Sequence, residues 1–167
     1  IKFSQGLLRI FVEAISNAID NVWRSKQANN PCKQIKIYIN KDTGETSVQN
    51  DGLCIPIEIQ EQTGLYNPEL IFGHLLTSSN YNDNEDRYTS GRNGLGIKLA
   101  NVFSKSFTVI CCDGKKKYEK TWNNNMRESI PHKITSCKVK GFTKVIWTPD
   151  FEKFNMTNYD NNILKIY

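Results

Sequence analysis

The 167-residue sequence lacks most of the features that mark secreted, membrane-spanning and metal-binding chains. No apolar run approaches the length that crosses a bilayer, and there is no signal-peptide pattern. The five cysteines form no C-x-x-C pair, so we expect neither a zinc site nor a disulfide framework, and a reducing, intracellular compartment fits best. Low-complexity linkers and internal repeats are also missing, which leaves one domain. With 38% hydrophobic and 11% aromatic residues, that domain can form a core.

The charge balance is basic, at +5. The triplet Lys115–Lys117 and several lysines between residues 133 and 144 supply much of the excess. Such a balance permits contact with nucleic acid but does not establish it. A run of this kind is more typical of a solvated hairpin tip than of a DNA contact.

Residues 3–23 have the strongest helical pattern, with apolar residues on one broad side. The opposite side carries a polar stripe that contains Glu13, Asn17, Asp20 and Asn21. Asparagine is a mediocre helix former, so its presence here is unusual for a solvent-facing surface. The stripe is either a plain polar face or a carboxylate placed one turn from an amide oxygen. The second arrangement suits a water-activating base beside a Mg²⁺ ligand.

A β-hairpin follows this helix. Residues 34–39 alternate apolar and polar, a turn falls at residues 42–44, and residues 46–50 return as the partner strand. The second strand ends in Asn50-Asp51-Gly52. A side-chain acceptor held at such a strand end could read the amino group of a purine, although the same residues also suit a structural Asx turn.

A glycine-rich loop runs directly into a helix over residues 89–103. Gly91, Gly94 and Gly96 let the backbone approach a ligand closely, and a helix N-terminus offers free N–H groups to phosphate. Arg92 and Lys98 add positive charge. The pattern predicts a polyphosphate site, or else only a turn before a helix. The polar run at residues 78–87 resembles a lid over such a site.

The remaining elements complete a mixed fold. Asn67-Pro68 starts a helix through Leu76, and strands are expected at 107–112, 117–122, 133–139 and 143–148, before a weak helix at 159–166. The order of elements predicts an α+β domain with two layers. Helices cover one face of a mixed, mostly antiparallel sheet.

Three motifs follow one another along the chain: Glu13-x-x-x-Asn17-Ala18-x-Asp20-Asn21, Asn50-Asp51-Gly52-x-x-Ile55-Pro56 and Gly91-x-x-Gly94-x-Gly96. Together they resemble the motif set of the GHKL ATPases, which have the Bergerat fold. Residues 70–81, 91–99 and 121–126 are similar in sequence to the ATPase domain of eukaryotic-type DNA topoisomerase II. The resemblance extends from Phe3 to about Phe154. The Asn- and Lys-rich composition would suit the version of a large DNA virus.

The resemblance implies ATP and Mg²⁺ as cofactors and assigns roles to matching positions. Glu13 would be the general base, and Asn17 would bind the Mg²⁺ that bridges the phosphates. Asn50 would read adenine, and Thr143 would support the adenine-side water network. The nucleotide contacts it implies are Asn17, Asn21, Asn50, Ile55, Ile71, Ser78, Ser79, Asn80, Gly91, Arg92, Asn93, Gly94, Leu95, Gly96, Ile97, Lys98 and Thr143.

Two positions depart from the family pattern. Cys54 stands where the second glycine of the D/N-x-G-x-G turn is usual, so it adds a side chain where the family has none. Asn50-Asp51 leaves open whether an amide or a carboxylate reads adenine. We retain Asn50, because it holds the first position of the motif.

The sequence begins at Ile1 rather than at methionine, so we expect residues 1–167 to be one domain of a longer protein. The family's dimerising N-terminal arm and its transducer domain, which supplies a hydrolytic lysine, are not in this sequence. We therefore expect a monomer that binds ATP and hydrolyses it slowly. The full-length enzyme would be a homodimer that acts on DNA, in the nucleus or in the host cytoplasm if viral.

Two other functions compete with this interpretation. A histidine-kinase-type GHKL domain shares the fold and a related motif set, but residues 70–81 and the Gly91-Arg92-Asn93-Gly94 loop disfavour it. A non-catalytic DNA-binding module is the second, and it depends on the +5 charge alone.

Overall fold

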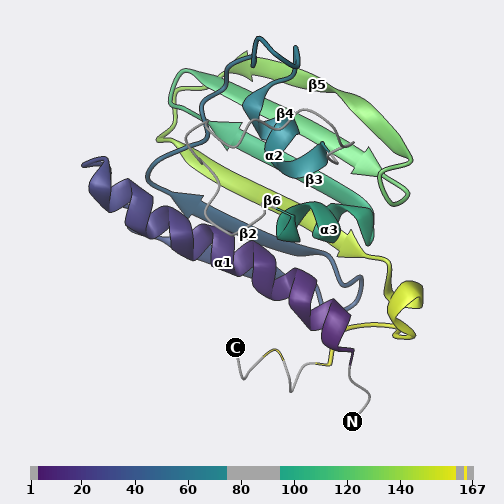
Figure 1. Ribbon diagram of the computed structural model, residues 1–167. Helices are drawn as coiled ribbons and strands as arrows, with labels where there is room; N and C mark the ends of the chain where they lie inside the picture. The colour runs from purple at the N-terminus through teal and green to yellow at the C-terminus, as the bar shows by residue number, and fades with distance from the viewer. Residues whose placement is uncertain (1–3, 75–94, 161–163, 165–167) are drawn as a thin grey trace.

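The computed structural model describes residues 4–74, 95–160 and 164 (Figure 1). Among these, no helix is long and apolar enough to cross a membrane. The lid-like run at 78–87 and the glycines at 91 and 94 lie outside the described residues. The elements are α1 (Gln5–Gln27), β1 (Ile35–Ile39), β2 (Thr46–Asp51), α2 (Asn67–Gly73), α3 (Gly96–Val102), β3 (Ser104–Cys112), β4 (Lys116–Asn123), β5 (Glu128–Ser136), β6 (Phe142–Pro149) and the 3₁₀ helix η1 (Phe151–Phe154).

The strands form one six-stranded sheet in the order β1-β2-β6-β3-β4-β5. Every pairing between the described strands is antiparallel. The three α-helices lie on the same face of the sheet, and α1 crosses it diagonally (Figure 1). The predicted two-layer α+β arrangement is therefore confirmed, with antiparallel pairing throughout the described sheet.

The core lies between these two layers. Because side chains alternate along a strand, one face of the sheet carries the buried residues Val48, Phe107, Val109, Val145 and Trp147. The helices contribute buried apolar residues to the same cluster, among them Leu7, Ile10, Phe11, Ala14, Phe72, Ile97 and Ala100. Ser4 caps α1 by accepting a hydrogen bond from the Leu7 N–H at 3.3 Å.

The two ends of the sheet are formed by different turns. What we call the Asp51 end comprises residues 33–35, 51–54, 112–117 and 136–142, which the strand register places together. The Lys41 end comprises residues 40–45, 104–105, 123–128 and 149–154. Helix α1 runs between them: Gly6 lies against Phe154, and the Ser25 hydroxyl accepts a hydrogen bond from the Leu53 N–H at 2.8 Å.

Strand β5 differs from its sequence-based prediction. It spans Glu128–Ser136, whereas the sequence predicts a strand at 133–139. Nearly all of its residues are exposed, because β5 forms one edge of the sheet. An exposed edge strand has no alternating apolar pattern, and Pro131 within it further obscures the signal.

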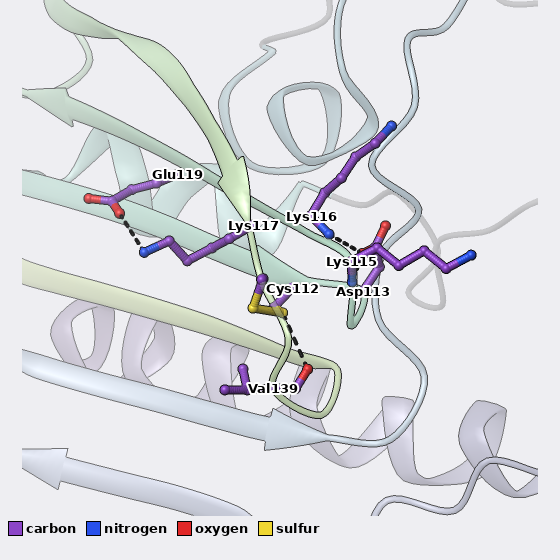
Figure 2. Close-up of a disulfide and its surroundings, with 8 residues drawn as sticks. Cys112, Asp113, Lys115, Lys116, Lys117, Glu119 and Val139 are labelled. Carbon is purple, nitrogen blue, oxygen red and sulfur yellow. Dashed lines mark hydrogen bonds and ion pairs between the residues drawn. A yellow bond between two sulfur atoms is a disulfide. The ribbon is translucent and has the colours of Figure 1, made fainter.

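A disulfide joins Cys112, the last residue of β3, to Cys137, which follows β5 (Figure 2). The expectation of no disulfide is therefore wrong for this pair. The two cysteines are 25 residues apart and follow no spacing motif. Pairing of β3 and β5 with β4 brings them together, and the Cys137 N–H donates to the Lys115 carbonyl at 2.8 Å. Only the sheet register reveals this pair.

We expect Cys137→Ser to lower the free energy of unfolding by about 3 kcal/mol, because the disulfide closes a loop of 25 residues in the unfolded chain. Urea unfolding of both proteins under oxidising conditions measures the difference. Cys32→Ser, which removes a free thiol, is the matched control. Equal midpoints for the wild type and Cys137→Ser would show that the disulfide does not stabilise the chain.

Candidate nucleotide-binding site

The polar residues along α1 are buried to different degrees. The Glu13 side chain is 20% exposed and forms an ion pair with Arg9 at 2.5 Å. Asn17 is partly buried, and Asn21, at 8% exposure, is buried. The Asn21 amide donates to the Asp51 carbonyl at 3.3 Å, so the stripe ends against the last residue of β2. This is not a plain solvent-facing surface.

Glu13 meets the start of α3. A Cβ atom added to Gly96 would overlap the Glu13 carboxylate, so only glycine leaves room for that side chain in its present position. Helix α1 packs directly on α3. The acidic residue of the first motif and the last glycine of the third motif are therefore neighbours, although 83 positions separate them in the sequence.

The described part of the glycine-rich segment has mixed exposure. Leu95 is 43% exposed, whereas Ile97 is 4% exposed and belongs to the core. Lys98 is half-buried, and burial lowers its pKa. An anion beside Lys98 would oppose that shift by favouring the charged ammonium.

Several predicted contacts fall on residues that the structure does not describe. These are Ser78, Ser79, Asn80, Gly91, Arg92, Asn93 and Gly94. Their proposed roles at ribose and phosphate stay predictions.

Asp51 is already engaged by the protein. Its Oδ1 accepts the backbone N–H groups of Lys33 at 2.7 Å and Gln34 at 2.9 Å, and its Oδ2 pairs with Lys140 at 2.7 Å. Burial raises the pKa of Asp51, but the hydrogen bonds from Lys140, Gln34 and Lys33 outweigh it and hold the pKa well below its usual range. This carboxylate anchors the start of β1, which leaves Asn50 as the candidate for base recognition.

Asn50 lies on the helix-facing side of β2 and is 6% exposed. The strand register places it opposite Thr143 of β6, which in turn lies opposite Cys111 of β3. Cross-strand partners share one face of a sheet, so these three polar or sulfur-bearing side chains form one row. Burial raises the pKa of Cys111 strongly, and a hydrogen bond with Thr143 opposes the rise in part. Ile55 and Ile71 pack at the edge of the core and are partly buried.

Cys54, the departure from the family pattern, is partly buried. Burial raises the pKa of its thiol, and the nearby charge of Asp113 adds to the rise. A Cβ on Gly141 would lie 3.8 Å from the Cβ of Cys54 and 3.2 Å from the Cys112 carbonyl. The Cys54 side chain therefore lies beside Gly141 at the Asp51 end.

Two residues that shape this region, Ser25 and Asn101, are not among those predicted from the sequence. Ser25 is fully buried and supports the turn after Asp51, and it continues the four-residue spacing of Glu13, Asn17 and Asn21. That spacing was a usable signal. Asn101 is 1% exposed and donates to the Phe72 carbonyl at 2.9 Å, which joins α3 to α2. No sequence pattern distinguishes Asn101 from an ordinary helical asparagine.

The depressed pKa of Asp51 predicts acid-sensitive stability. Because its pKa is lower in the folded state than the ordinary 3.8, the stabilisation is present above that value and is lost as the pH falls toward the folded-state pKa. We expect Asp51→Asn to lower the free energy of unfolding by about 1–3 kcal/mol at pH 7. The difference should shrink below about pH 4 in urea unfolding. The exposed Asp42→Asn is the control, and a pH-independent difference would contradict the explanation.

Comparison with known proteins shows the family to which the chain belongs. A family described as "Histidine kinase-, DNA gyrase B-, and HSP90-like ATPase" matches residues 4–152. DNA topoisomerase 2 of Invertebrate iridescent virus 6 is 47% identical over 176 residues, which cover 98% of this chain and 15% of the viral protein. DNA topoisomerase 2 of Candida glabrata is 49% identical over 165 residues, which cover 96% of this chain and 11% of that protein.

A solved structure gives the same result for the fold. The crystal structure of the ATPase region of Saccharomyces cerevisiae topoisomerase II matches with a TM-score of 0.82 and 42% identity, over 99% of this chain and 44% of that one. The chain thus corresponds to a small part of the full-length relatives. It belongs to the histidine kinase-, DNA gyrase B- and HSP90-like ATPase family, and its sequence and fold are similar to those of the ATPase region of DNA topoisomerase II.

Proposed function

We propose that this chain is the ATP-binding and ATP-hydrolysing module of a type IIA DNA topoisomerase. Nucleotide binding would close the N-gate of a homodimer and so drive DNA strand passage. The observation that carries the proposal is the position of the Glu13 carboxylate against Gly96. On α1, Glu13 lies one helical turn from Asn17. In this proposal, Glu13 as general base and the start of α3 at Gly96 would lie on two sides of one site.

Glu13 is suited to take a proton from the attacking water. As the water oxygen forms its bond to the γ-phosphorus, the proton passes to the carboxylate, and the bond to the bridging oxygen breaks to release ADP. The Glu13 side chain is partly buried and forms an ion pair with Arg9, which would hold the carboxylate in place beside the water.

Asn17 would hold Mg²⁺ through its amide oxygen. Amide and carboxylate oxygens are hard ligands of the kind that Mg²⁺ prefers, and Mg²⁺ usually takes few protein ligands beside phosphate oxygens. Among the described residues, no group of three His, Cys, Asp or Glu side chains is arranged to hold a metal ion. When bound, the ion would neutralise charge that develops on the phosphates.

Asn50 and Thr143 would recognise adenine at the end of β2. Asn50 can present an oxygen to the amino group of the base, and Thr143 lies opposite it in the neighbouring strand. Ile55 and Ile71 would pack against the ring. Asp51 is bound elsewhere, which supports the amide as the reader.

An isothermal titration with a non-hydrolysable ATP analogue, with and without Mg²⁺, tests the proposal. We expect binding that weakens without Mg²⁺ and that is lost in Asn50→Ala. Gln49→Ala, the neighbouring residue on the opposite face of β2, is the control. Absence of binding in the wild type, or transfer of phosphate to a histidine, would overturn the assignment. The proposed slow hydrolysis would be contradicted by turnover equal to that of a chain that includes the transducer domain.

A further inference from the structure

Helix α3 is too short to hold its position by itself. It spans only the seven residues Gly96–Val102. Isolated helices of this length are unstable in water, so contacts with other elements must fix its position. Its first residue, Gly96, lies against the Glu13 carboxylate, and its last residue, Val102, lies about 9 Å further along the helix axis. The contacts that fix the far end of α3 therefore also set the position of Gly96.

Hydrogen bonds from two other elements reach the C-terminal end of α3. The Asn125 amide, in the turn between β4 and β5, donates to the Val102 carbonyl at 2.9 Å. The Ser104 hydroxyl, at the start of β3, donates to the Ala100 carbonyl. The last carbonyl groups of a helix lack partners within the helix, and these two side chains supply them. The end of α3 is thus tied to the sheet by side chains that come from different strands.

Asp150 joins this set of hydrogen bonds from the segment after β6. The Asn125 amide also donates to the Asp150 carboxylate at 3.1 Å, and the Asp150 N–H donates to the Phe103 carbonyl at 2.8 Å. Asp150 is only 3% exposed, and Lys105 pairs with it at 3.5 Å. We call Ser104, Asn125 and Asp150 the α3 anchor. Asn125 is its central member, because it contacts both α3 and Asp150.

The turn that carries Asn125 has an unusual backbone. Asn124, Asn125 and Met126 have φ values of 51°, 60° and 63°, so three consecutive residues other than glycine are left-handed. This conformation costs free energy, although asparagine tolerates it better than most residues. The N–H groups of Asn124 and Asn125 donate to the carbonyls of Lys105 at 2.8 Å and Ser104 at 3.0 Å. The start of β3 therefore holds the turn in the conformation from which the Asn125 amide reaches α3.

We propose that Asn125 is a positioning residue of the nucleotide site. With Ser104 and Asp150 it fixes the C-terminal end of α3, and α3 carries that position to Gly96 and so to the contact with Glu13. A working site must hold its groups within about 0.5 Å, and residues that touch neither the ligand nor the reacting atoms supply that support. The inference rests on the proposed function, in which Glu13 and Gly96 lie on two sides of one site.

The alternative is that Asn125 stabilises the fold and has no effect on Gly96. Thr46 offers a comparison for that case. It is fully buried at the start of β2, and its hydroxyl forms hydrogen bonds with the Gly44 carbonyl and the Tyr159 hydroxyl, each at 3.2 Å. Thr46→Val removes both bonds and keeps the shape of the side chain. Like the loss of the Asn125 amide, it removes two hydrogen bonds, but it does so away from α3.

The variant Asn125→Gly tests the proposal, because glycine keeps the left-handed turn and removes only the side chain. Asn124→Gly is the matched control, since Asn124 is exposed and left-handed in the same turn. Thr46→Val is the control for a general loss of stability. The NMR signal of the Gly96 amide in the nucleotide-free chain reports the position of the helix start. Single-turnover hydrolysis at saturating ATP and calorimetry with an ATP analogue separate the rate from the affinity.

We expect Asn125→Gly to shift or broaden the Gly96 signal and to lower the rate at saturating ATP about ten-fold or more, because a displacement of about 1 Å in a site can cost a factor of about 100. The two controls should leave the Gly96 signal unchanged and the rate within about two-fold of the wild type. An unchanged Gly96 signal in Asn125→Gly, or equal losses of rate in all three variants, would overturn the proposal.

Two further outcomes are separated by design. If circular dichroism shows that Asn125→Gly does not fold, Ser104→Ala takes its place, because it removes another side-chain donor from the same end of α3. That variant should also displace the Gly96 signal, and an unchanged signal would overturn the proposal. A wild type that binds no ATP analogue would overturn the proposed function, whereas the Gly96 signal would still decide whether Asn125 positions α3.

Discussion

Replacing Glu13 with glutamine is expected to lower ATP hydrolysis by roughly two to four orders of magnitude, because glutamine keeps the shape of the side chain but cannot accept the proton of the attacking water. Nucleotide affinity should stay within about three-fold of the wild type, since the interaction lost belongs to the transition state. Since we expect slow turnover, single-turnover hydrolysis at high protein concentration is the suitable measurement. Calorimetry with an ATP analogue gives the affinity.

Two further variants separate the role of Glu13 from a general effect of charge. Glu45→Gln removes an exposed carboxylate from the Lys41 end and should leave hydrolysis unchanged. Gly96→Ala places a methyl group where the Glu13 carboxylate now lies, so it should displace that side chain and slow hydrolysis without loss of stability, as alanine favours the helix. Loss of nucleotide binding in Glu13→Gln would show that the carboxylate has another role.

Local patterns in the sequence predicted most of the fold. The helical pattern at 3–23 corresponds to α1, and the hairpin at 34–39 and 46–50 corresponds to β1 and β2 within one residue at each end. Each of these elements buries one face, so the spacing of its apolar residues indicates which residues contact the core. Strand β5 has no buried face, and its position was consequently misplaced.

The grouping of the site residues required the family resemblance or the structure. Spacing alone suggested that Glu13 and Asn17 share a helix face, but nothing local indicated that Gly96 would lie against Glu13. The row formed by Asn50, Thr143 and Cys111 is a consequence of strand register, which the sequence specifies only through the pairing of the whole sheet. The Cys112–Cys137 disulfide belongs to the same class of long-range contacts.

The choice between Asn50 and Asp51 shows what the structure adds to a motif. In sequence the two residues are adjacent and either could read a base. On β2 they point to opposite faces, Asn50 toward the helices and Asp51 toward Lys140. The Asp51 carboxylate anchors the start of β1, which agrees with the choice of Asn50 as the candidate that reads the base.

We expect Gly52→Ala to cause the largest loss of stability, about 3 kcal/mol or more. Gly52 has a φ of +93°, which an alanine adopts only with strain, and a Cβ there would lie 2.6 Å from the Ser25 hydroxyl and 2.9 Å from the Cys32 backbone. Because Asn50 and Asp51 immediately precede this turn, nucleotide affinity should fall as well. Urea unfolding and calorimetry measure the two effects.

Gly64→Ala is the matched control, since Gly64 also has a positive φ, of +69°, but has open space around its Cβ position. Gly64→Ala should lower the free energy of unfolding by only about 1 kcal/mol, because it adds backbone strain without a clash. The double variant Ser25→Ala/Gly52→Ala tests the source of the clash. Removal of the Ser25 hydroxyl should recover part of the loss, but the Cys32 backbone cannot move away, so recovery must stay incomplete. Equal losses for Gly52→Ala and Gly64→Ala would mean that the close approach of α1 to this turn does not constrain the site.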